Sequence, residues 1–304
     1  MKLIPKSTLH YVAYLTFCHT LSIHVNKFIL SVLRFTYPTV FQGWQTFVAV
    51  IIMRILMFEN LSAVVCLKSF CSHLPLFLSF VGAIVAGSKA LSYLPIPIIV
   101  AVSNLLPALN HILTTCRSDA TNYFLFSNSI LCVVSVLAIF FSDHNLSSFS
   151  VAALWLYTHL LFGASQDIFN NEDTSTRFSS FDKLFYCNLF SVVVLAPSSL
   201  YLEEAFEALH FQERSQLSFL FGCVLSGVSG TLGSVLSLHS ASESLNVNAI
   251  SKVLLCLFSP MILPCSLSYF TWLLIYIILI TSCFIPHSAT EVMDCSRPKQ
   301  LEHV

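Results

Sequence analysis

Apolar runs of about 20 residues recur along almost the whole chain and are separated by short polar segments. A helix of about 20 apolar residues can cross a hydrocarbon core about 30 Å thick. The runs are continuous rather than alternating, which excludes a transmembrane barrel. The pattern predicts ten membrane-spanning helices at 9–33, 39–58, 74–93, 95–115, 122–141, 149–168, 183–202, 217–239, 247–265 and 267–285. The loops between them are too short to hold a soluble domain.

The predicted spans divide into two halves of five that share a pattern of small residues. Small residues fall four apart in the third span and again in the eighth: Gly82, Ala86 and Ala90, then Gly222, Ser226, Gly230 and Ser234. Such a stripe lets two helices approach closely in lipid, and ordinary packing explains either stripe alone. Its repetition indicates two inverted five-helix repeats, the plan of secondary transporters with a substrate site between the halves. We therefore expect an all-α polytopic membrane protein with one transmembrane domain over 1–285, repeats of about 1–145 and 146–285, and a cytosolic tail at 286–304.

Composition excludes several classes of protein. Apolar residues make up 56% of the 304 residues and charged residues 10%, with a mean hydropathy of +0.80, which excludes an ordinary soluble domain. The net charge of −1 and the lack of a basic cluster argue against nucleic acid as a partner. The eleven cysteines fall mostly within predicted spans, so they are interpreted as small apolar residues rather than as a disulfide framework or a zinc site.

The distribution of lysine and arginine predicts the orientation. Nine basic residues fall on the side of the termini: Lys2, Lys6, Arg54, Lys68, Arg117, Arg177, Lys183, Arg297 and Lys299. Only Arg34 and Arg214 fall on the far side, and Lys27, Lys89 and Lys252 fall within spans. The positive-inside rule then places both termini in the cytosol. The first run is too long for a signal peptide and has no small-residue cleavage site, so we expect a retained helix.

No enzyme motif is present, and neither a metal nor a cofactor is expected. The chain has no Gly-rich phosphate loop, no His-Glu-x-x-His pair and no carboxylate pair within the predicted spans. Five histidines lie within or beside spans but share no metal-ligand spacing, so they are expected to pack rather than to bind metal: His19, His24, His111, His159 and His239.

Lys252 is the strongest candidate for a binding residue. It stands at the head of the apolar run of the ninth span, with Asn248 and Ser251 beside it. A lysine inside a bilayer is costly and marks a candidate anion site, although its long side chain could instead reach the interface. The same alternative applies to Lys89, near the far end of the third span.

Two further features suit a binding cavity. The fourth span contains Pro107, and the ninth contains Pro260 and Pro264, so both are expected to be kinked helices that line a cavity. In the seventh span Tyr186 and Asn188 pair an aromatic ring with a carboxamide, as a nucleobase requires, although aromatic belts at membrane interfaces give similar patterns.

Three ordered motifs resemble a known family. The motifs are Lys89-Ala-Leu-Ser-Tyr-Leu-Pro-Ile-Pro97 with Asn104, then Phe185-Tyr-Cys-Asn188, then Asn248-Ala-Ile-Ser-Lys252. They resemble the fourth-span approach and the two binding motifs of Golgi nucleotide-sugar transporters of the GDP-mannose type, in the drug/metabolite transporter superfamily. The family motifs read Phe-Tyr-Asn-Asn and Gly-Ala-Leu-Asn-Lys. The segment 26–45 is similar to the vertebrate group called transmembrane protein 241, proposed to carry UDP-N-acetylglucosamine.

The resemblance implies roles for individual residues. Tyr186 and Asn188 would contact the base, and Ala249, Ser251 and Lys252 would contact phosphate or sugar. The other candidate substrate-binding residues are Asn248, Asn104 and Lys89. The chain departs from the family motifs at Cys187, Asn248 and Ser251. An amide missing at Cys187 slightly favours a UDP-sugar over a GDP-sugar.

The resemblance implies the drug/metabolite transporter fold and a nucleotide-sugar antiporter in the Golgi membrane, with the endoplasmic reticulum as the alternative. It would carry UDP-N-acetylglucosamine, or GDP-mannose as second choice, into the lumen in exchange for a nucleoside monophosphate. A homodimer is a candidate assembly in the bilayer. The competing hypothesis is a scaffold or receptor that retains the transporter fold without transporting.

Overall fold

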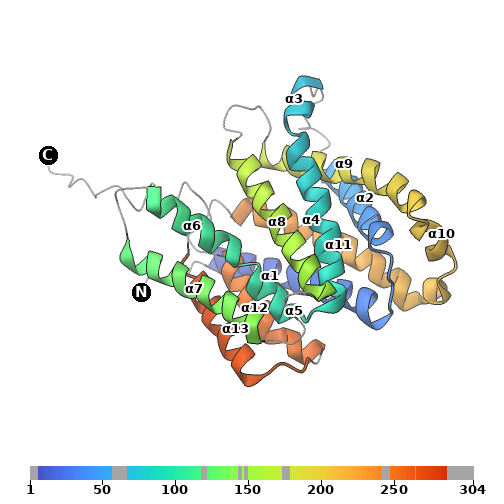
Figure 1. The fold of residues 1–304 in the computed structure, drawn as a ribbon. Coiled ribbons are helices and arrows are strands. Elements are labelled where there is room, and N and C mark those ends of the chain that lie inside the picture. The colour runs from blue at the N-terminus through green and yellow to red at the C-terminus, as the bar shows by residue number, and fades with distance from the viewer. Residues whose placement is uncertain are drawn as a thin grey trace.

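The computed structural model describes residues 6–56, 67–117, 122–142, 146, 150–172, 179–240, 247–263 and 265–285. All regular secondary structure within these residues is helical (Figure 1). The elements are α1 Lys6–Lys27, the π-helix η1 Phe28–Val32, α2 Pro38–Leu56, α3 Leu67–Ser72, α4 Leu74–Tyr93, α5 Ile96–Val102, α6 Leu105–Arg117, α7 Tyr123–Ser142, α8 Val151–Glu172, α9 Ser180–Tyr201, α10 Glu204–Leu209, the 3-10 helix η3 Gln212–Ser215, α11 Leu217–Ser240, α12 Val247–Ile262 and α13 Tyr269–Ser282. Each of the ten predicted spans overlaps one helix, except that the first continues from α1 into η1 and the fourth is divided into α5 and α6.

Six helical segments in the described part of the chain are long and apolar enough to cross a membrane: Pro38–Leu56, Leu74–Tyr93, Ile96–Cys116, Tyr123–Ser142, Ser180–Tyr201 and Leu217–Leu238. Two apolar stretches are shorter, Asn248–Ile262 and Tyr269–Ser282. The predicted class, an all-helical polytopic membrane protein, is therefore confirmed. The number of ten spans and the inverted repeat stay predictions. The predicted tail 286–304 lies outside the described residues, as do most of the residues around the predicted repeat boundary at about 145 and 146.

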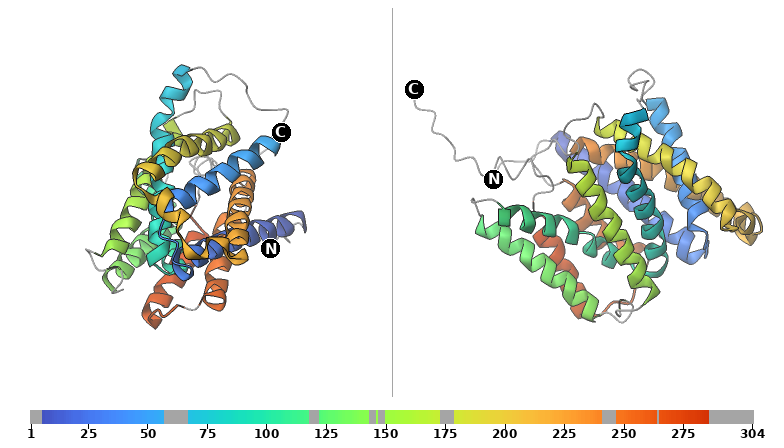
Figure 2. Two further views of the ribbon diagram at one scale, coloured as in Figure 1. Left: turned by 90° about the vertical axis from the view of Figure 1, so that its right-hand side faces the viewer. Right: turned by 45° about the horizontal axis from the view of Figure 1, so that its top comes forward.

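The helices pack in pairs that are far apart in the sequence. The principal pairs are α4 with α8, α1 with α11, α2 with α9 and α7 with α13, and the neighbouring helices α4 and α8 are visible in both views of Figure 2. The small-residue stripes lie at two of these contacts. A methyl group added to Gly82 of α4 would lie 2.5 Å from the Phe162 ring of α8, and one added to Gly222 of α11 would lie 3.2 Å from Ile29. Both stripes therefore serve helix packing.

The fourth predicted span is broken into α5 and α6 at Ser103 and Asn104. Pro107 has no N–H to offer the carbonyl four residues before it, so the regular ladder of backbone bonds cannot continue through this point. The side chain of Asn104 partly replaces the ladder, since its Nδ2 donates to the carbonyl of Val100 at 2.9 Å. The predicted interruption of this helix is confirmed, and it places a buried carboxamide in the middle of the bundle.

Lys27, within the first predicted span, binds the end of another helix. Its Nζ donates to the carbonyls of Leu91 at 2.7 Å, Ser92 at 3.3 Å and Leu94 at 2.9 Å. Carbonyls at the C-terminal end of a helix lack intrahelical donors and carry partial negative charge. Lys27 therefore supplies both hydrogen bonds and a positive charge where α4 ends.

Candidate functional site

The centre of the bundle contains a lysine bound across the two halves of the chain. Lys252, on the second turn of α12, donates from Nζ to Oδ1 of Asn104 at 3.0 Å. Asn104 is fully buried, and its amide nitrogen is already engaged with α5. The break in α5–α6 therefore fixes the carboxamide that receives the lysine. The ammonium of Lys252 therefore has a buried polar partner inside the bundle, whereas a snorkelling lysine would extend its ammonium toward the membrane interface.

A histidine joins the same group of polar side chains. Asn248, Ser251 and Lys252 lie on one face of α12 because residues three and four apart are neighbours on a helix. His19 of α1 has its Nδ1 3.5 Å from the Ser251 hydroxyl and its Nε2 3.3 Å from the hydroxyl of Ser237 on α11. Ser237 in turn donates to Asn248 Oδ1 at 3.4 Å. The structure thus brings together four of the candidate residues, Asn248, Ser251, Lys252 and Asn104, and adds His19, which was expected only to pack.

Asp167 is a second residue that the sequence did not single out. It lies on α8, near the end of the sixth predicted span, where Asn110 of α6 donates from Nδ2 to its Oδ2 at 3.1 Å. The carboxylate lies on the face of α8 that packs toward α6, the helix that follows Asn104. The position near a predicted loop gave no signal, because only the packing of α8 against α6 brings this carboxylate next to Asn110.

Asn188 lies in a cavity of about 140 Å³ between α2, α4, α9 and α11. The polar residues that line the cavity are Gln42, Gln45, Thr46, Asn188, Ser226, Thr231 and Ser234. Gln45 is held in place by Asn26, since its Nε2 donates to Asn26 Oδ1 at 2.8 Å, and it also donates to Ser226. The amides of α2 could not be predicted as lining residues, since no motif marks them and the packing of α2 against α9 and α11 alone places them opposite Asn188.

Tyr186 and Cys187 lie in an aromatic cluster beside this cavity. The Tyr186 ring packs edge to face on Phe185 with centroids 5.4 Å apart, and Cys187 is buried against Leu76 and Phe77. Neither residue lines the cavity itself. The absence of an amide at Cys187 therefore removes no group from this cavity, and the argument against guanine based on that position loses its force.

Lys89 lies apart from the central group. It lines a different cavity at the end of α4, together with Arg34, and its Nζ is 3.5 Å from the carbonyl of Thr36. The structure thus places the predicted site residues in three locations: the group around Lys252, the cavity of Asn188 with Tyr186 beside it, and the end of α4.

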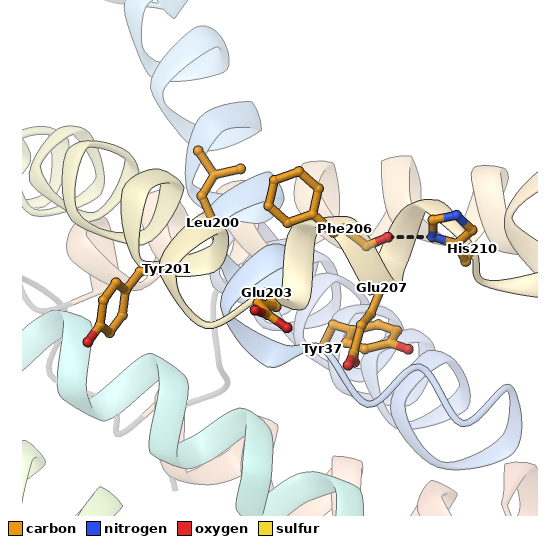
Figure 3. A pocket seen from close by; sticks show the side chains of 7 residues that line it. All are labelled: Tyr37, Leu200, Tyr201, Glu203, Phe206, Glu207 and His210. Carbon is orange, nitrogen blue, oxygen red and sulfur yellow. Dashed lines mark hydrogen bonds between the residues drawn. The ribbon is translucent and has the colours of Figure 1, made fainter.

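A wider surface groove of about 660 Å³ lies where α9 meets α10, and Figure 3 shows the side chains that line it: Tyr37, Leu200, Tyr201, Glu203, Phe206, Glu207 and His210. None of the predicted site residues lines this groove. The adjacent Glu204 accepts hydrogen bonds from the backbone N–H and the hydroxyl of Thr39 in the first turn of α2. A carboxylate at a helix N-terminus is stabilising, so α10 fastens the start of α2.

A bundle of apolar helices that contains a half-buried lysine bound to a buried carboxamide defines a polytopic membrane protein with an internal polar site. No protein-family model matches the chain. The chain is 31% identical over 241 residues to the UDP-N-acetylglucosamine transporter TMEM241 homolog of Xenopus laevis, covering 78% of this chain and 80% of the relative. It is 33% identical over 223 residues to the UDP-N-acetylglucosamine transporter TMEM241 of Mus musculus, covering 71% and 74%.

A more distant similarity is to the GDP-mannose transporter 1 of Emericella nidulans, 30% identical over 173 residues, which covers 51% of this chain and 45% of the relative. The chain belongs to the nucleotide-sugar transporter family. The family resemblance stated from its motifs is thereby confirmed, and the protein is a membrane transporter rather than an enzyme.

Proposed function

We propose that the protein is a nucleotide-sugar antiporter that carries cytosolic UDP-N-acetylglucosamine into the Golgi lumen and returns a nucleoside monophosphate. The observation that carries the proposal is the bond between Lys252 and Asn104, which holds a cation between the two halves of the bundle. A buried cation with a polar partner is a ready counter-charge for the diphosphate of a nucleotide sugar. UDP-N-acetylglucosamine comes first because two relatives are named for it, and GDP-mannose comes second.

The pattern of helix packing supports two inverted repeats. An approximate two-fold axis would exchange the first predicted span with the sixth and the third with the eighth. The third packs on the sixth as α4 on α8, and the eighth packs on the first as α11 on α1. The pairs α2 with α9 and α7 with α13 would each map onto themselves. We therefore propose ten spans in two repeats within one domain over 1–285, with substrate bound between them.

A polar path along α11 supports binding of an extended nucleotide. Ser234 lines the cavity of Asn188, and Ser237, about one turn further along the helix, contacts His19 and Asn248 beside Lys252. In our proposal the base occupies the cavity, where Asn188 and the glutamines of α2 present amides, with Tyr186 supporting its wall. Ala249, Ser251 and Lys252 then face the phosphates and the sugar.

Reconstituted vesicles offered a panel of nucleotide sugars provide the direct test. We expect saturable uptake of UDP-N-acetylglucosamine above that of the other sugars, because the relatives that share most of the chain bear this name. Protein-free vesicles and vesicles with an unrelated membrane protein supply the background. If the protein neither binds nor takes up any nucleotide sugar of the panel, the competing hypothesis of a scaffold or receptor is favoured. If it prefers GDP-mannose, the proposed order of the two substrates is reversed.

The proposed orientation places both termini in the cytosol, in the Golgi membrane or alternatively in that of the endoplasmic reticulum. It depends on nine basic residues on the side of the termini against two on the other side. Epitope tags at Met1 and Val304 should both be stained after permeabilisation of the plasma membrane alone. A tag on a far-side loop, such as after Glu213, should stay protected. Protection of only one terminus would require an odd number of spans and contradict the repeat.

A further inference from the structure

Two cations line one cavity at the end of α4, and Lys252 is not among the residues that line it. Arg34, in the turn after η1, and Lys89, on the last turns of α4, line one cavity of about 210 Å³. Among the described residues that line it there is no carboxylate. The proposed topology puts this cavity on the far, lumenal side of the membrane.

No described carboxylate lines the cavity or pairs with its two cations. Lys89 has one bond, to the carbonyl of Thr36 at the long distance of 3.5 Å, and Arg34 has neither a hydrogen bond nor an ion pair to any described residue. Glu204, the carboxylate bound at the start of α2, is engaged with Thr39 instead. A guanidinium and an ammonium that face the same cavity attract an anion, and phosphate groups match the donor geometry of arginine.

A buried hydroxyl in the same cavity provides an independent observation. Ser88 is only 4% exposed, and its Oγ has no hydrogen-bond partner among the residues that the structure describes. An unsatisfied buried hydroxyl costs free energy, so such groups usually have a ligand or a water. Two other serines line the cavity, and their hydroxyls already donate to carbonyls: Ser31 at 2.9 Å and Ser92 at 2.7 Å. Of these three serines, Ser88 is the one whose hydroxyl has no described partner.

The backbone places Arg34 at this position at a cost. Arg34 has φ of 55°, in the left-handed region that residues with a Cβ rarely adopt, and only Leu33 separates it from the five-residue π-helix η1. Both features are uncommon and are found at functional sites. The π-helix and the left-handed turn together end α1 so that Arg34 reaches the cavity of Lys89.

We propose that Arg34, Lys89 and Ser88 form a second anion site, which binds the phosphate of a phosphate monoester at the far-side mouth of the transporter. Its role in exchange depends on the proposed function: the returning nucleoside monophosphate binds here before it enters the central site at Lys252. The same chemistry would accept inorganic phosphate or the phosphate of an anionic lipid. The binding site itself does not depend on transport.

Phosphate binding by the full-length protein in phosphatidylcholine nanodiscs tests the site. The background variant is Lys252→Met, which removes the central cation and isolates the second site. In that background inorganic phosphate should still bind, and Arg34→Gln or Lys89→Gln should weaken it about tenfold or more, because each removes a charge-assisted bond. Ser88→Ala should weaken it less. Arg214→Gln is the matched control, since Arg214 is a far-side arginine outside the cavity that donates to the carbonyl of Leu209. Equal phosphate binding with and without the Arg34 and Lys89 substitutions would overturn the proposal.

Nanodiscs that contain phosphatidic acid distinguish the two sources of phosphate. If a lipid occupies the site, added inorganic phosphate should no longer bind, and mass spectrometry of the intact complex should show a retained phosphatidic acid that Arg34→Gln loses. If a soluble phosphate occupies it, the lipid should have no effect. Both results support the site, and a retained lipid that is unaffected by Arg34→Gln contradicts it.

The proposed role in exchange has a separate readout. In the chain with Lys252 intact, Arg34→Gln with Lys89→Gln should raise about tenfold the lumenal uridine monophosphate concentration that gives half-maximal exchange. The KM for nucleotide sugar on the cytosolic side should be unchanged. If the protein binds phosphate through Arg34 but transports nothing, the anion site stands and the proposed function fails. If exchange occurs with unchanged dependence on lumenal monophosphate, the role in exchange is wrong.

Discussion

Replacing Lys252 with methionine or alanine should reduce nucleotide-sugar uptake by reconstituted vesicles by about 30-fold or more. The expected size follows from removing one partner of a buried charged contact, which costs about 2–5 kcal/mol, at 1.4 kcal/mol for each factor of ten. Methionine keeps most of the volume of the side chain, so packing around α12 is preserved and the lost charge is the main change. Asn104 keeps its own bond to Val100, and the break between α5 and α6 should therefore remain in place.

Two companion variants make this result specific. Lys183→Ala removes a lysine near the start of α9 that belongs to no proposed site, and it should leave uptake nearly unchanged. Lys252→Arg retains the charge with a planar, larger head group, so an intermediate loss is expected if geometry at the phosphate matters. Thermal unfolding of each variant in detergent checks the fold. Near-normal uptake by a well-folded Lys252→Met protein would remove Lys252 from the site.

Vesicles preloaded with the matching nucleoside monophosphate should take up nucleotide sugar several-fold faster than empty vesicles. An empty carrier must pass through its closed state with Lys252 lacking a substrate phosphate, and an uncompensated charge raises that barrier. A difference of about 1–2 kcal/mol corresponds to about a 5- to 30-fold difference in rate. In the proposed binding mode the return substrate presents the same base to the cavity of Asn188 and a phosphate to Lys252, so both ligands would load the central site.

The carboxylate of Asp167 allows a sharper test of this prediction of exchange. We expect this carboxylate, which is bound by Asn110 on α6, to offset part of the Lys252 charge when no substrate is bound. Asp167→Asn should therefore make exchange stricter, with slower uptake into empty vesicles and little change in preloaded ones. Equal uptake by empty and preloaded wild-type vesicles, or uptake that follows an imposed proton gradient, would show that Lys252 does not enforce exchange. A proton-driven mode abolished by Asp167→Asn would assign the coupling to that carboxylate.

Several features of the protein follow from local properties of the sequence and were predicted correctly. The all-helical membrane class follows from the long apolar runs, and six described helical segments are long and apolar enough to cross a membrane, because length and hydropathy are properties of contiguous residues. The interruption at Asn104 follows from Pro107, because proline cannot donate the backbone hydrogen bond to the carbonyl four residues earlier in its own helix. The motif at 248–252 places Asn248, Ser251 and Lys252 on one face because helical spacing alone determines that face.

The tertiary structure decided which of these faces meet. Lys252 and Asn104 lie 148 residues apart in the chain, and only the packing of α12 against α5 makes them partners. His19 and Asp167 had no recognisable spacing, because residues on α1 and α8 meet their polar partners through contacts with other helices. The position at which α4 ends against the turn after η1 likewise decides that Lys89 lies apart from Lys252. It also decides that Lys89 lines one cavity with Arg34 and Ser88. Hydropathy is a property of each segment and can be determined from the sequence of that segment alone. Which side chains share a cavity depends instead on the packing of segments that are distant in the sequence.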